Sequence, residues 1–178
     1  DGLLRIKPAM ARVAELAMPA VAITDHHNFF GLLKAYKAAA AQGIKLIVGA
    51  DLHVIDPNDQ ERHHELCLLA QNECGYQNLM LLLSEAYQQG QFLGRPRVQL
   101  DWVQAHSDGL IALSGGRQGD VGQALLHGRE DDARSALQRW LQWFPNRYYL
   151  ELQRTGRSDE EEYVHAAVRL AGEYACPV

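Results

Sequence analysis

Cysteine and long apolar runs are both scarce in this sequence. It has three cysteines, Cys67, Cys74 and Cys176, an odd number without CxxC spacing. This pattern favours free thiols in a reducing compartment over a disulfide framework. No apolar stretch is long enough to cross a bilayer. We therefore expect a cytoplasmic protein with no membrane partner.

The sequence also lacks an excess of positive charge. It has 17 Lys and Arg against 22 Asp and Glu, a net charge of -5 and a pI near 5.9. A nucleic-acid-binding surface that extends over the whole protein is therefore excluded. Any DNA contact must be local or made by another region. With 178 residues and 47% hydrophobic content, the chain is long enough for one well-buried domain.

Apolar runs alternate with segments of helical periodicity along the chain. Expected helices cover residues 8–16, 29–42, 76–88, 101–106, two segments within 121–144, and 158–173, and expected strands cover 20–24, 44–48, 52–55, 65–70, 110–113 and 148–153. A turn cluster at 56–59 predicts a hairpin onto 65–70. The alternation predicts the α/β class, with a parallel (β/α) barrel as the architecture.

Asp25 and His26 directly follow the first expected strand, and His27 comes next. Loops at the carboxyl ends of parallel strands form the usual functional face of such folds. An imidazole beside a carboxylate suits zinc, manganese or iron. The alternative is structural: Asp25 caps the following helix, and the two histidines are polar loop residues. The pair alone does not decide between them.

Further polar residues stand near the ends of other expected strands. They are Asp51, the run His63, His64 and Glu65, and the later residues Ser114 and Glu151. Such a cluster can hold one to three divalent ions and activate water against a phosphate ester. The remaining histidines, His53, His106, His127 and His165, are interpreted as outward-facing or helical and are left out of the site.

A short glycine-rich loop follows the strand at 110–113. Ser114, Gly115 and Gly116 are able to cradle a phosphate with backbone N–H groups, but the same three residues also make a tight turn. We favour the turn.

Several segments together resemble a known family. They are residues 22–31 (AITDHHNFFG), 47–51 (IVGAD), 68–72 (LLAQN) with 75–79 (GYQNL), 113–116 (LSGG), and 148–157. In order and spacing they resemble the PHP (polymerase and histidinol phosphatase) domain that opens the alpha subunit of bacterial DNA polymerase III, of the proteobacterial replicative type. The resemblance extends over essentially the whole chain.

The resemblance implies a distorted (β/α) barrel, with residues 1–178 as a single PHP domain fragment. The first and last strands of the barrel would lie outside this excerpt of a longer polypeptide. It also implies that the parent protein carries out template-directed DNA synthesis with magnesium. The implied partners are the proofreading exonuclease subunit, other replicase subunits, and DNA through the parent polymerase. A divalent metal, zinc or manganese, is implied for intact PHP sites.

Several residues depart from the family's metal-site pattern. Asp51 stands where metal-binding members carry Glu, Glu65 stands where they carry His, and His64 is displaced from that position by one residue. Gln153 and its neighbours also lack the expected His. We therefore predict a vestigial site made of Asp25, His26, Asp51, His64 and Glu65, with little phosphoesterase activity and a scaffold role that includes exonuclease docking. The alternatives are a standalone metal-dependent phosphoesterase and a built-in editing nuclease.

Overall fold

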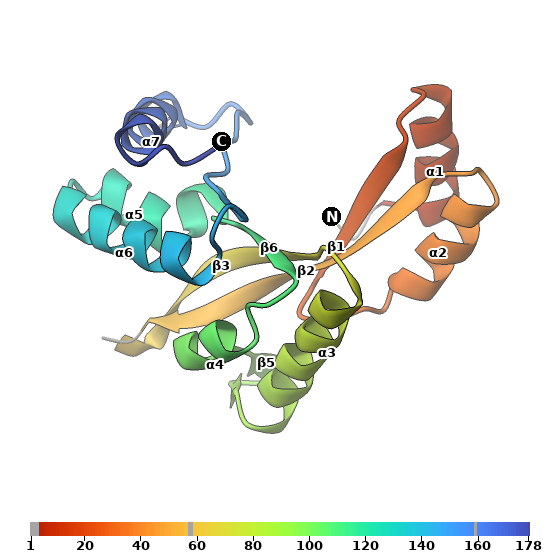
Figure 1. Cartoon of the computed structure of the whole chain (residues 1–178), viewed down its shortest axis with the longest axis horizontal. Helices are drawn as coiled ribbons and strands as arrows, with labels where there is room; N and C mark the ends of the chain where they lie inside the picture. The colour runs from red at the N-terminus through yellow and green to blue at the C-terminus, as the bar shows by residue number, and fades with distance from the viewer. Residues whose placement is uncertain (1–3, 57–58, 159) are drawn as a thin grey trace.

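A five-stranded, strongly curved sheet organises the molecule in this computed structural model, which describes residues 4–56, 59–158 and 160–178 (Figure 1). The strand order is β1-β2-β3-β6-β7. The strands are β1 (Ala20–His26), β2 (Lys45–Asp56), β3 (Asp59–Ala70), β6 (Leu110–Leu113) and β7 (Tyr148–Tyr149). A separate small hairpin pairs β4 (Gln91–Phe92) with β5 (Arg95–Pro96). The α/β class predicted from the sequence is confirmed.

The sheet is mixed rather than wholly parallel. β1 pairs in parallel with β2, and β6 pairs in parallel with β7, but β3 runs antiparallel to both of its neighbours. The parallel barrel expected from the sequence needs this correction, because β2 and β3 are joined by the predicted hairpin rather than by a helix. Pro57 and Asn58 of the predicted turn lie outside the described residues.

Helices follow or precede most strands. They are α1 (Ile6–Glu15), α2 (Leu32–Ala40), α3 (Glu73–Gln88), α4 (Leu100–Ala105), α5 (Asp120–Leu126), α6 (Glu130–Trp143) and α7 (Glu160–Tyr174), with a 3-10 turn, η1 (Gly116–Gln118). The start of α3 is capped by Asn72, whose side-chain oxygen accepts a hydrogen bond from the Gly75 N–H at 3.0 Å. Each helix expected from periodicity is present within a few residues of its predicted ends.

Three predicted elements differ from the structure. β2 is continuous through Asp51, where a break was expected, because Gly49 and Ala50 are buried between β1 and β3 and pair with both. Residues 91–98, where the sequence predicts neither a helix nor a strand, contain the β4–β5 hairpin. β7 has only two residues because β6, its neighbour in the sheet, pairs with it only at Tyr148 and Tyr149.

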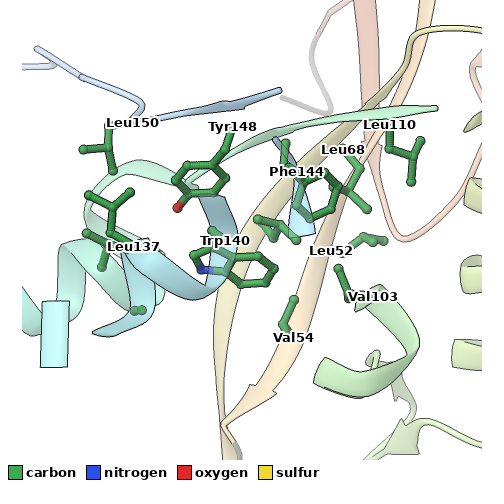
Figure 2. Close-up of a cluster of buried hydrophobic side chains, with 14 of the residues drawn as sticks. Leu52, Val54, Leu68, Val103, Leu110, Leu137, Trp140, Phe144, Tyr148 and Leu150 are labelled. Carbon is green, nitrogen blue, oxygen red and sulfur yellow. The ribbon is translucent and has the colours of Figure 1, made fainter. Parts of the chain in front are cut away.

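The main core lies on the helix-covered face of the sheet (Figure 2). Leu52, Val54 and Leu68 reach it from alternate strand positions, and Phe144 reaches it from the end of α6. The Trp140 ring stacks on Tyr148 with 6.0 Å between ring centroids. These large side chains are almost completely buried, so they supply most of the apolar stabilisation of this region.

A second, smaller core holds α1 and α2 against β1 and the start of β2. Its buried members are Met10, Ala39 and Ile44. In Figure 1 these two helices lie together on one side of the molecule, away from α5, α6 and α7. We call residues 4–45 the α1–α2 lobe.

The three cysteines are unpaired, with Cys67 and Cys176 buried and Cys74 exposed. Among the helices of the described ranges, none combines the length and the apolar character that crossing a membrane requires.

Candidate functional site

Strand register brings three of the predicted site residues to the same face of the sheet. His26 on β1 is the pairing partner of Asp51 on β2, so the two side chains emerge side by side. His53, two residues after Asp51, pairs with Glu65 on β3. Since strand residues two apart share a face, His26, Asp51 and Glu65 all lie opposite the main core. We call this surface the site face.

The antiparallel direction of β3 explains why Glu65 belongs to this group. In a parallel sheet, the end of β1 would lie beside the end of each other strand. Here the first half of β3 lies beside the second half of β2, just beyond the point where β1 ends. The hairpin therefore places Glu65 near the end of β1, where the sequence predicts that the site residues gather.

The structure does not bring Asp25 and His64 into this group. Asp25 pairs with the fully buried Ala50, and its Oδ2 accepts a hydrogen bond from the Gly31 N–H at 2.7 Å. It therefore fixes the loop before α2, as the structural alternative proposed. His64 pairs with Val54 on the core side, and its Nε2 lies 3.2 Å from Asp56 Oδ2.

Three histidines gather beside these residues, and only one of them, His63, was among the candidates near the strand ends. The ring centroids of His27 and His53 are 4.3 Å apart, and those of His53 and His63 are 4.0 Å apart. His27 has a left-handed backbone (φ 58°), and its N–H donates to the Asp51 carbonyl at 2.9 Å. The interpretation of His53 as outward-facing misses this position, although a spacing of two from Asp51 predicts that both residues lie on the same face.

The imidazoles of this cluster are held neutral. Burial, followed by the charges of His26 and His63, lowers the pKa of His27 to about 4. Burial, followed by the neighbouring His27 and His63, lowers the pKa of His53 to about 3. Both ring nitrogens of His27 are buried without a hydrogen-bond partner in the described structure, as is Nδ1 of His53. The cluster therefore carries unused lone pairs and N–H groups at neutral pH.

Carboxylates crowd the other part of the site face. Burial raises the pKa of Glu65, and the charges of Asp51 and Glu151 raise it further against the opposing effect of His26. Burial also raises the pKa of the Cys67 thiol, which hydrogen-bonds with Asp51. Glu151 accepts a hydrogen bond from Gln153 Nε2. Three carboxyl groups thus influence one another across β2, β3 and the segment after β7.

This arrangement does not fit a bound metal ion. In the part of the chain that the structure describes, no three His, Cys, Asp or Glu side chains are grouped so that they could hold one. The imidazoles of His27, His53 and His63 pack ring against ring rather than pointing nitrogens at a common centre. Glu151 is engaged by Gln153, and Asp51 by Cys67.

The loop of Ser114, Gly115 and Gly116 is a packed turn. The Ser114 hydroxyl accepts a hydrogen bond from the Glu151 N–H at 2.9 Å and is almost fully buried. Gly115 and Gly116 both have positive φ angles, 71° and 56°, and a side chain on Gly115 would collide with the Glu65 carbonyl. The loop joins β6 to η1 beside the site face, in keeping with the favoured turn interpretation.

A cavity of about 680 Å³ lies between the β2–β3 hairpin and helices α5 and α6. Two ion pairs lie along it: His64 with Asp56, and Arg139 with Asp120 at 2.6 Å. Asp120 also accepts a hydrogen bond from Trp140 Nε1 at 2.9 Å. The contacts of Asp120 tie α5 to α6, and His63 and Glu65 on β3 also line this cavity.

Comparison with known proteins gives the class of the fold first. The chain is similar to a crystal structure from Bifidobacterium adolescentis assigned as a metal-dependent phosphoesterase, with a TM-score of 0.55, 13% identity, and coverage of 96% of this chain and 79% of the other. It is also similar to an amidohydrolase from Chromobacterium violaceum determined with sulfate and no metal, with a TM-score of 0.60, 15% identity, and coverage of 99% and 80%. At these identities the likeness concerns the fold.

The family follows from the sequence match. Residues 1–155 match the PHP domain family, and the chain belongs to it. Over its whole length it is 45% identical to the DNA polymerase III subunit alpha of Pseudomonas aeruginosa, and it is 49% identical to that of Escherichia coli K12. The chain spans 15% of the length of each of these relatives.

Proposed function

We propose that this chain is the amino-terminal PHP domain of a bacterial replicative DNA polymerase, where it acts as a scaffold. The observation that carries the proposal is the identity of 45% to 49% to DNA polymerase III alpha subunits over the full chain. In this proposal residues 1–178 form one PHP domain fragment, and template-directed DNA synthesis with magnesium belongs to the rest of the parent protein.

The geometry of the site face supports a scaffold role over hydrolysis. Glu65 replaces the histidine of intact sites, and its pKa is raised first by burial and then by the charges of Asp51 and Glu151. His64, the adjacent histidine, lies on the opposite face of β3. The residues that remain, His26 and Asp51, are too few to bind a catalytic ion tightly. We interpret Asp25, His26, Asp51, His64 and Glu65 as remnants of a metal site.

The proposal includes the cellular setting. A PHP domain that has lost its metal chemistry can still stabilise the polymerase and dock the proofreading exonuclease subunit. Other replicase subunits and DNA would be reached through the parent protein, in the cytoplasm. The acidic net charge of -5 agrees with DNA contact made mainly elsewhere.

The test measures metal content and two activities of the full-length protein that contains this chain. We expect substoichiometric zinc and manganese by elemental analysis and no phosphoesterase turnover with either ion added. We also expect magnesium-dependent primer extension. His26→Ala should leave the rate of primer extension within about twofold of that of the unchanged protein, because the residue lies outside the polymerising centre. A tenfold change in this rate would need a change of about 1.4 kcal/mol in the activation barrier.

The control is His165→Ala, which removes an exposed imidazole on α7. Failure of primer extension in the full-length protein would contradict the polymerase assignment. Near-stoichiometric metal, with phosphoesterase turnover abolished by His26→Ala and retained in His165→Ala, would contradict the scaffold role.

A second candidate function is metal-dependent phosphoester hydrolysis, either as a standalone phosphoesterase or as an editing nuclease within the polymerase. Two observations favour it: the fold shared with the Bifidobacterium protein, and the unpartnered ring nitrogens of His27 and His53 beside the carboxylates. Zinc or manganese would be the metal. Hydrolysis of DNA ends by the full-length protein, lost on metal removal, would favour this candidate.

A further inference from the structure

Helix α2 presents an apolar stripe to solvent. Phe30 stands just before the helix and is 83% exposed, Leu33 is 64% exposed, and Tyr36 is 62% exposed. Their spacing of three residues places them along one side of the helix. Exposed large apolar residues are ordinary when scattered, whereas three in a row form a continuous surface.

The opposite side of α2 is already in use. Ala35 and Ala39 are buried, and Ala39, with Ala38 beside it, belongs to the small core shared with α1 and β1. The helix is therefore fully positioned by its alanine face. The stripe of Phe30, Leu33 and Tyr36 is left without a role in holding the lobe together.

Positive charge accompanies the stripe. Residues 4–45 carry six basic and two acidic side chains, whereas residues 46–178 carry eleven basic and nineteen acidic ones. All four lysines of the protein lie in the first 45 residues, and none has an ion-pair partner among the described residues. Lys34 and Lys37 follow Phe30 and Leu33 by four residues each, so they border the stripe.

The two acidic groups of the lobe do not neutralise this surface. Glu15 pairs with Arg12 at 3.0 Å, and Asp25 accepts a hydrogen bond from the Gly31 N–H. The α2 stripe is therefore an apolar centre with free positive charge at its border, on a protein that is otherwise acidic.

We propose that this face of α2 docks an acidic amphipathic helix of a partner protein. An apolar stripe on such a helix covers Phe30, Leu33 and Tyr36, and its flanking carboxylates meet Lys34 and Lys37. Charge complementarity selects the partner, since a basic or neutral helix leaves the two lysines unpaired. The inference rests on the surface of α2 and does not depend on the polymerase assignment.

The same surface suits a nucleic acid less well. Binding of single strands uses aromatic rings as platforms for successive bases along a basic track. Here an aliphatic side chain, Leu33, separates the two aromatic residues, and α2 offers only two lysines beside them. An apolar centre surrounded by charged residues is typical of protein–protein interfaces.

The test uses the full-length protein and a fluorescent 21-residue peptide with Leu at heptad positions a and d and Glu at the other positions. We expect saturable binding by fluorescence anisotropy. Leu33→Ser with Tyr36→Ser should weaken binding at least about tenfold, as for residues central to an interface. Lys34→Glu with Lys37→Glu should weaken it by a similar factor, and 0.5 M salt should weaken binding to the unchanged protein about fivefold.

Leu93→Ser is the matched control, because Leu93 is 88% exposed on the β4–β5 turn and away from α2. It should bind the peptide within about twofold of the unchanged protein. Circular dichroism should show the same helix content in all variants, since the substituted side chains are exposed.

Three outcomes would overturn the proposal. The first is equal binding of a peptide with Lys in place of Glu. The second is binding of an oligothymidylate, but not the acidic peptide, through Lys34 and Lys37. The third is self-association of the protein that Leu33→Ser with Tyr36→Ser abolishes, since the occupant would then be a second copy.

Discussion

The α1–α2 lobe and the rest of the molecule use the same helix-on-sheet packing with different side chains. In the lobe, the buried members of the core are Met10, Ala39 and Ile44. Around α3 to α7, buried leucines, Phe144, Trp140 and Tyr148 fill the core. Since apolar stabilisation scales with buried area, the lobe contributes far less of it.

The difference in packing is matched by a difference in surface. Helix α2 buries alanines and exposes Phe30, Leu33 and Tyr36, the reverse of α6, where Leu137 and Trp140 are buried. The comparison suggests that the main core carries the stability of the domain, while the lobe keeps apolar surface for binding. The comparison predicts that truncating a buried side chain lowers the free energy of unfolding more in the main core than in the lobe.

The largest effect is expected from Phe144→Ala in the main core. Phe144 is fully buried, so the substitution should lower the free energy of unfolding of the 178-residue chain by about 3–5 kcal/mol. Urea denaturation followed by circular dichroism measures this. Leu93→Ala, at an exposed turn, is the control and should change the value by less than about 0.5 kcal/mol. A small effect of Phe144→Ala would refute the assignment of the main core as the stabilising unit.

A smaller and more local effect is expected from Met10→Ala in the lobe. Met10 is also almost fully buried, but it anchors only α1 and α2, so the loss should be about 2–3 kcal/mol. Amide hydrogen exchange should accelerate about 30-fold or more in those two helices and stay unchanged in β3 and β6. Equal acceleration in all of these elements would mean that the two regions unfold as one unit, and the comparison would fail.

The sequence predicted the helices, the hairpin and the family because each depends on local periodicity or on a motif of neighbouring residues. Helical spacing in 76–88 and the turn cluster after Ile55 are examples. The predicted hairpin implies that β3 runs antiparallel to β2, but the antiparallel pairing of β3 with β6 is a long-range contact that the parallel-barrel prediction missed. The two-residue extent of β7 depends on its pairing with β6, which is a long-range contact.

The candidate site was predicted in part for the same reason. His26, Asp51 and Glu65 were identified from motifs, and strand register brings them to one face. His53 was left out because its orientation was assigned without the register, although it lies two residues from Asp51. His27 is absent from the predicted site because nothing local signals that its left-handed backbone brings its ring centroid to 4.3 Å from that of His53. The role of the whole set as a remnant metal site stays a prediction.

Helix α7 is joined to the rest of the molecule through polar contacts as well as apolar ones. Glu160, at the start of this helix, accepts hydrogen bonds from the Thr155 N–H at 2.6 Å and the Gly156 N–H at 2.7 Å, and another from the Thr155 hydroxyl. The bond from the Thr155 hydroxyl, followed by the backbone bonds, lowers the pKa of Glu160 to about 2.

Because the pKa in the folded state lies below the ordinary value of 4.5, the carboxylate stabilises the fold above about pH 4.5. That contribution is lost as the pH falls from about 4.5 to about 2. We expect Glu160→Gln to be less stable than the unchanged chain at pH 7 and to approach it near pH 2, in urea denaturation at a series of pH values. Glu162→Gln, in the same helical turn but exposed, should leave the pH profile unchanged. If both substitutions flattened the profile equally, general charge at the helix start would explain the effect, and the specific cap would not be needed to hold α7.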